Sequence, residues 1–133
     1  MASTSGILNF MSNQFWKICS AYLPVLIWGL VIYLFSSQTS LPGFDVALYD
    51  YILKKAAHMT VYGVLYFLLF RAINYGKPKT IANWWLPLLI TLGYAITDEF
   101  HQIFTPRRHP SPLDVGFDMM GASIVYLRLY KYI

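Results

Sequence analysis

The sequence predicts an all-α fold, a polytopic membrane protein whose four transmembrane helices form a bundle. Of its 133 residues, 57% are hydrophobic and only 12% are charged, whereas about 25% of the residues of an ordinary soluble domain are charged. A chain of this length forms one domain at most, and a soluble core of that size could not hide so much apolar surface. In addition, short polar segments separate long apolar runs, as expected of successive membrane spans.

The first predicted transmembrane helix covers residues 18–35. Its 18 residues suit a spanning helix better than the core of a signal peptide, which has about 7 to 15 residues. Pro24 lies within the first two turns, where a missing N–H group does least harm. Residues 1–17 form an N-terminal segment of mixed polarity, and we expect residues 18–133 to form the four-helix transmembrane domain.

The second and third helices are expected over residues 52–73 and 84–104. Residues 36–50 hold Ser, Gln, Pro, Gly and two acids, so a loop is expected to precede the second helix, with a short surface helix within it left open. A short turn at 74–83 then carries two lysines. The third helix opens with two tryptophans, which are typical of the interfacial belt of membrane proteins.

The fourth helix is expected over residues 114–130, after a proline-rich loop at 105–113. Its apolar stretch is short, and Asp118 interrupts it. Tyrosines and two basic residues follow near the end of the chain and are typical of an interfacial anchor.

The charged residues predict the orientation in the membrane. Six of the ten basic residues belong to one side, namely Lys17, Arg71, Lys77, Lys79, Arg128 and Lys131. The other side holds the remaining four basic residues, which are Lys54, Lys55, Arg107 and Arg108, together with all six acids and all three histidines. Because cytoplasmic loops are enriched in Lys and Arg, we expect both termini to be cytoplasmic and the acidic side to be extracytoplasmic.

The most polar stretch of the chain is residues 98–121. It holds four of the six acids, two of the three histidines and two of the ten basic residues. An ionisable group beside lipid costs about 2.5 to 3.5 kcal/mol on insertion scales. Such groups are seldom kept without a function, so we expect a polar site here, at one face of the bundle.

On each of the last three helices, polar residues recur at helical spacing and therefore share a face. In chain order these sets are Lys55, His58 and Tyr62; Asp98 and Gln102; and Asp114 and Asp118. Glu99 lies about 100° around its helix from Asp98. Because the three polar faces avoid lipid, they are expected to converge on one extracytoplasmic cavity together with Arg108.

With these residues laid out, the chain resembles the VanZ-like family of small integral membrane proteins, named after a teicoplanin-resistance protein. A Ser-rich stretch of the family is matched by Ser36, Ser37 and Gln38, and the pattern Lys-x-x-His-x-x-x-Tyr by Lys55, His58 and Tyr62. The pattern Asp-Glu-x-x-Gln-x-Phe-x-Pro-x-Arg is matched by Asp98, Glu99, Gln102, Phe104, Pro106 and Arg108, and a later Asp by Asp114. The resemblance covers roughly residues 26–125 and departs from the family at Asp118, where an Asn is expected. It implies four transmembrane helices in the bacterial cytoplasmic membrane and, in one member, reduced sensitivity to a lipoglycopeptide antibiotic.

Two classes of function fit the polar site. In the first, the protein is a membrane-embedded enzyme that acts on a lipid-linked or acylated cell-envelope substrate at the outer leaflet and affects teicoplanin susceptibility. The candidate catalytic residues are His58, Asp98, Glu99 and Asp114, with the histidine or a carboxylate as general base. The candidate substrate-binding residues are Lys55, Tyr62, Gln102, Arg108 and Asp118, in which the cations would hold a phosphate or carboxylate.

In the second class, the protein binds a lipid or lipoglycopeptide without transforming it. A purely structural interpretation is also open, in which Lys55 and Arg108 pair with the acids and tie helices together. His101 and His109, near or in the loop, are expected to be solvated. The sequence leaves the oligomeric state open.

Other functions lack support in the sequence. The net charge is +4, but the basic residues do not gather in one patch, so no nucleic-acid partner is expected. Cys19 is the single cysteine, which excludes an intrachain disulfide and a cysteine-based metal cluster. Familiar catalytic motifs are absent. Metal binding is open to a mixed nitrogen and oxygen set, although the spacing specifies neither a metal nor a cofactor. That set is His58, Asp98, Glu99 and Asp114.

Overall fold

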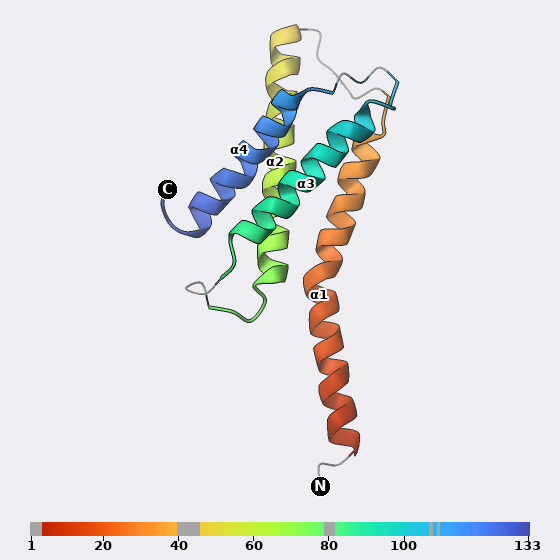
Figure 1. Ribbon diagram of the computed structural model, residues 1–133, viewed down its shortest axis with the longest axis vertical. Helices are drawn as coiled ribbons and strands as arrows, with labels where there is room; N and C mark the ends of the chain where they lie inside the picture. The colour runs from red at the N-terminus through yellow and green to blue at the C-terminus, as the bar shows by residue number, and fades with distance from the viewer. Residues whose placement is uncertain (1–3, 40–45, 79–81, 107, 109) are drawn as a thin grey trace.

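The computed structural model of the chain describes residues 4–39, 46–78, 82–106, 108 and 110–133. All regular secondary structure in these ranges is helical, and the helices number four (Figure 1). The all-α fold class predicted from the sequence is therefore confirmed for the described part of the chain.

The four helices are α1 (Thr4–Ser36), α2 (Ala47–Ile73), α3 (Trp85–Gln102) and α4 (Pro112–Leu129). The last two begin and end within two residues of the expected bounds. The first begins at Thr4 rather than at residue 18, because polar side chains end an apolar run without ending a helix. The second also begins earlier, and the acidic Asp50 in its first turn favours the positive end of the helix dipole.

Two helical stretches among the described residues are long and apolar enough to cross a membrane, Phe15–Ser36 and Leu48–Ile73. Only 11% of the first is buried inside the protein, whereas the core helix of a soluble protein is mostly buried. Its apolar surface therefore faces outward, as lipid contact requires. Helices α3 and α4 have 18 residues each, or about 27 Å at 1.5 Å per residue, and both carry buried acids.

Helix α2 contacts each of the other three helices, and its contact with α4 is the most extensive. Two glycines make this close approach possible. A Cβ added to Gly121 would lie 1.9 Å from the carbonyl oxygen of Met59. A Cβ added to Gly63 would lie 3.2 Å from the carbonyl oxygen of Gly121. Small residues at helix contacts are typical of membrane bundles, because they let two backbones meet.

Helix α1 extends well beyond the other helices at its N-terminal end (Figure 1). Side-chain hydrogen bonds attach its C-terminal half to the bundle, two of them at Trp28 and Gly29. The indole Nε1 of Trp28 donates to the carbonyl oxygen of Val61 at 2.9 Å. The hydroxyl of Tyr94 donates to the carbonyl oxygen of Gly29 at 2.6 Å.

The two ends of the bundle differ in character. At one end, where α2 leads into α3 and α4 ends, aromatic side chains pack around Tyr66 and Phe70. The amide of Asn74 donates to the carbonyl oxygen of Asn83 at 2.8 Å and holds the α2–α3 connection. At the opposite end, α1 and α3 finish and α2 and α4 begin (Figure 1). The buried acids lie toward this second end.

Candidate functional site

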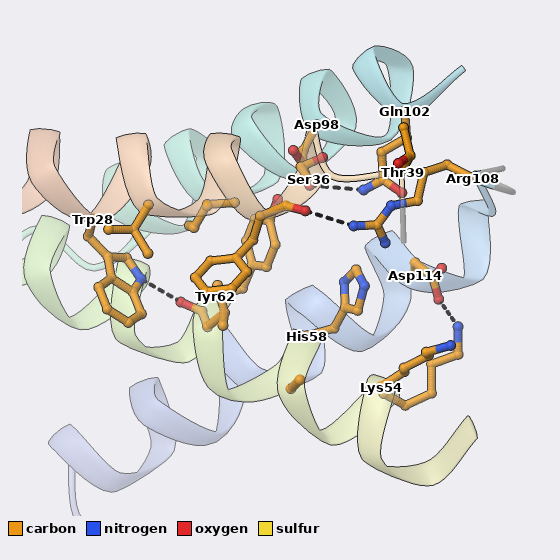
Figure 2. Close-up of a pocket in the computed structure, with 16 residues that line it drawn as sticks. Trp28, Ser36, Thr39, Lys54, His58, Tyr62, Asp98, Gln102, Arg108 and Asp114 are labelled. Carbon is orange, nitrogen blue, oxygen red and sulfur yellow. Dashed lines mark hydrogen bonds and ion pairs between the residues drawn. The ribbon is translucent and has the colours of Figure 1, made fainter. Parts of the chain in front are cut away.

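A cavity of about 660 Å³ lies at the acidic end of the bundle (Figure 2). One wall is mainly apolar and comes from α1, through Trp28, Val31, Ile32 and Phe35. The other wall comes from α2, α3, the loop after α3 and the start of α4, and it is polar. It includes Lys55, His58, Tyr62, Asp98, Gln102, Arg108 and Asp114. The three polar helix faces therefore meet, as expected from their spacing.

His58 points into this cavity from α2 (Figure 2). Its ring nitrogen Nδ1 lies 3.0 Å from the carboxylate oxygen Oδ1 of Asp118 on α4. Asp118 does not line the cavity and is only 1% exposed. The carboxylate that departs from the family pattern is thus a buried partner that orients the imidazole.

Lys55 forms an ion pair with Asp114 across α2 and α4. Its ammonium group also lies 5.1 Å from the ring centre of Tyr51 and 5.6 Å from that of Phe117. The structural interpretation of Lys55 as a helix tie is therefore supported, although both members of the pair still line the cavity.

Asp98, Gln102 and Tyr62 form the part of the polar wall nearest α3. The amide Nε2 of Gln102 donates to the carboxylate of Asp98 at 3.2 Å, as their spacing of four residues permits. Tyr62 lines the cavity with Asp98 and is 1% exposed, and its buried hydroxyl has no hydrogen-bond partner among the described residues. All three side chains are shielded from bulk solvent.

Arg108 does not pair with the acids. Its Nε donates to the carbonyl oxygen of Gln38 at 3.0 Å. Its terminal nitrogen Nη2 donates to the carbonyl oxygen of Phe35 at 2.7 Å (Figure 2). These carbonyls lie at the C-terminal end of α1, where backbone acceptors lack helical partners. Within the described residues, no carboxylate lies within ion-pair distance of Arg108. Its charge is thus held in place by neutral partners.

Glu99 lies outside the cavity lining, behind the polar wall. Its Oε2 accepts a hydrogen bond of 2.8 Å from the backbone N–H of Ser111, the N-cap residue of α4. Ligand atoms of Glu99, Asp118 and His58 all lie within 4.8 Å of one another. The structure thus places three charged or titratable groups from three helices in one cluster.

The structure adds residues that the motifs did not indicate. Trp28 and Ile32 line the cavity from α1, and their spacing of four residues was a usable signal that α1 turns one face inward. His101 was expected to be solvated but is half-buried, with its ring centre 4.9 Å from that of Tyr33. The expectation for His109 lies outside the described residues.

The comparisons with known proteins agree with the motifs. The VanZ/LLP1 family model matches residues 4–132, a longer stretch than the region of about residues 26–125 that carries the motifs. The comparisons with curated proteins and with solved structures gave no match. The family match, together with the apolar helices, indicates a membrane protein. Because nearly the whole chain matches the family model, the chain belongs to the VanZ/LLP1 family.

Proposed function

We propose that the protein binds the head group of an acylated or lipid-linked cell-envelope molecule at the outer leaflet of the membrane. In this proposal all four helices span the membrane, both termini are cytoplasmic and the cavity opens toward the extracytoplasmic side. Such binding would change access to the envelope and thereby alter susceptibility to teicoplanin.

The two-sided cavity carries the proposal. Its α1 wall offers apolar surface, of which Phe35 is 60% exposed. Facing this wall are charged and hydrogen-bonding side chains, including Arg108. An amphiphile matches such a site, because its chain lies against apolar surface while its head group is hydrogen-bonded. The charge of Arg108 favours an anionic head group, since guanidinium groups suit phosphate and carboxylate.

The distribution of basic residues supports the orientation. Lys77 follows the C-terminal end of α2, and Arg128 and Lys131 lie at the end of α4. At this end of the bundle α2 leads into α3 (Figure 1), whereas the residues that line the cavity lie toward the other end. The positive-inside tendency assigns the end with these basic residues to the cytoplasm. The expected sides of four other residues fall outside the described residues: Lys79, Asp45, Arg107 and His109.

A second candidate function is catalysis on the bound molecule, and one observation favours it. The imidazole of His58 faces the cavity and is oriented by the buried carboxylate of Asp118. A histidine held in this way is suited to act as a general base. In this reading His58 would take a proton from water or a hydroxyl group beside the bound head group.

Binding is tested with detergent-purified protein and two short-chain lipids, an anionic phosphatidylglycerol and a zwitterionic phosphatidylcholine. We expect tighter binding of the anionic lipid. Arg108→Gln should weaken it about tenfold or more, since a hydrogen bond to a charged group contributes about 1.5 to 3 kcal/mol. The matched control Lys77→Gln removes a cation from the opposite end and should leave binding unchanged. Equal affinity for both lipids, unaffected by Arg108→Gln, would contradict the proposal.

A second pair of variants tests the apolar wall without touching Arg108. Val31 lines the cavity, whereas Leu34 is on the exposed side of α1 and does not. Val31→Trp should fill the site and reduce lipid binding, while Leu34→Trp should not.

Catalysis is tested separately: His58→Gln should abolish any chemical change of a bound lipid-linked substrate while binding is retained. If binding and phenotype fall together in all variants, the catalytic reading is withdrawn.

A further inference from the structure

Beside the cavity, three helices bring three potential metal ligands together. They are His58 on α2, Glu99 on α3 and Asp118 on α4, and one ligand atom from each lies within 4.8 Å of the others. Glu99 is 7% exposed and Asp118 is 1% exposed. Carboxylates are almost never this deeply buried unless they are paired or coordinate a metal ion.

The hydrogen bonds around this cluster leave two oxygens without partners. Oε1 of Glu99 and Oδ2 of Asp118 are buried and have no hydrogen-bond partner among the described residues. The other oxygen of each carboxylate is used, by the N–H of Ser111 and by the ring of His58. Since an unpaired buried acceptor costs about 1 to 3 kcal/mol, and more when charged, two of them in one cluster indicate that another species is needed there.

We propose that His58, Glu99 and Asp118 bind a divalent transition-metal ion of the Zn²⁺ or Mn²⁺ class. One imidazole nitrogen and two carboxylate oxygens form a mixed ligand set that suits such ions. The two carboxylates together balance the charge of the ion, with the imidazole neutral. With metal–ligand distances of about 2.0 to 2.2 Å in a tetrahedral arrangement, two ligand atoms lie about 3.3 to 3.6 Å apart. The ligand atoms of the cluster, which lie within 4.8 Å of one another, would therefore need to move closer by up to about 1.5 Å.

The surroundings of the cluster suit a metal site in two further respects. The N–H of Ser111 fixes the Glu99 carboxylate through one oxygen, which is how outer partners usually orient metal ligands. His58 also lines the cavity. Three protein ligands leave a coordination position for water or a ligand, and this position would lie toward the cavity. The inference does not depend on which molecule the cavity binds.

Metal binding is tested on detergent-purified protein that has been stripped with EDTA and titrated with ZnCl₂ and, separately, MnCl₂. We expect one ion per chain by calorimetry and elemental analysis, and a rise in the unfolding temperature on adding the metal. Asp118→Asn and Glu99→Gln keep the side-chain shape but should weaken binding about a hundredfold, since even outer partners contribute 10- to 100-fold. The matched control Asp50→Asn removes a carboxylate that pairs with Lys54 on α2, outside both the cluster and the cavity lining, and should keep full affinity.

Several outcomes would overturn the proposal. Stripped wild-type protein that takes up far less than one ion per chain would do so, and would indicate that a proton is shared between the two carboxylates instead. Unchanged affinity in Asp118→Asn, or a loss in Asp50→Asn equal to the loss in Asp118→Asn, would contradict the ligand assignment. A measurement on the wild type avoids variants that fail to fold: bound Co²⁺ should give visible absorption bands of a nitrogen and oxygen site, and their absence would count equally against it. Lipid binding is scored in the same samples, so failure of one proposal is distinguishable from failure of the other.

Discussion

The close contact of α2 with α4 makes Gly121 the position where the smallest change should have a large effect. In Gly121→Ala the new methyl group would lie 1.9 Å from the carbonyl oxygen of Met59, 2.6 Å from its carbonyl carbon and 2.7 Å from its Cα. All three atoms belong to the backbone of α2. No side-chain rotation can relieve this clash, so the two helices must separate.

The size of the separation follows from the contact distances. Ordinary contact begins at 3.4 Å and the built Cβ lies at 1.9 Å, a difference of 1.5 Å. A parallel shift of α4 by that amount would stretch the His58–Asp118 contact from 3.0 Å to about 4.5 Å, beyond hydrogen-bond distance. Overpacking costs about 1 to 3 kcal/mol, and the lost bond to a carboxylate adds about 1.5 to 3 kcal/mol. We expect the free energy of unfolding to fall by about 3 kcal/mol.

The assay is reversible unfolding in detergent micelles, with Gly116→Ala as the matched control. Gly116 lies on the same helix, and nothing lies within 4 Å of a Cβ added there. The control should be neutral or stabilised by up to about 1 kcal/mol, because alanine favours helix over glycine. If Gly121→Ala proves as stable as Gly116→Ala, the close approach of the two helices and the argument built on it are refuted.

Further predictions concern orientation and the attachment of α1. In a Cys19→Ser background, Gln38→Cys should react with an impermeant maleimide added to intact cells and Lys77→Cys should not; the reverse pattern would invert the proposed orientation. Arg108→Lys should lower the free energy of unfolding by about 1 kcal/mol in the same micelles, since one ammonium group cannot replace both guanidinium hydrogen bonds at the end of α1. An unchanged free energy of unfolding would refute the idea that these bonds stabilise the end of α1. Trp28→Phe should lower it by a similar amount by removing the 2.9 Å bond to α2, and an unchanged value would show that this bond adds no stability.

Much of the fold could be predicted because membrane helices leave a strong signal in composition. The bounds of α3 and α4 were predicted to within two residues, since Trp84 and the loop prolines mark their limits. The start of α1 could not be predicted in this way. An apolar run reports where lipid is expected, whereas a helix continues until its backbone hydrogen bonding is interrupted, and nothing between Thr4 and residue 18 interrupts it.

The helix faces that meet at the candidate site were predictable, but neither the pairing of their side chains nor the position of Glu99 and Asp118 outside the cavity lining was. Helical spacing indicates that Lys55 and His58 share a face, as do Asp114 and Asp118. Which of these residues meet depends on the register between α2 and α4, and that register is set by the close approach at Gly121. Spacing along one helix carries no information on this offset. The sequence therefore left Lys55 open to several acids, whereas the structure pairs it with Asp114.

The register also separates the charges of this site into two kinds. The Lys55–Asp114 pair neutralises itself, so it can hold α2 to α4 without any further partner. Among the described residues, Arg108 is hydrogen-bonded to neutral carbonyls and not to a carboxylate, while Glu99 and Asp118 each keep a buried oxygen without a described partner. A charged group without a counter-charge is costly near lipid. Arg108 would therefore be stabilised by a bound anion, and the carboxylates of Glu99 and Asp118 by a bound cation. The anion proposed beside Arg108 and the cation proposed at the carboxylates would together supply these counter-charges.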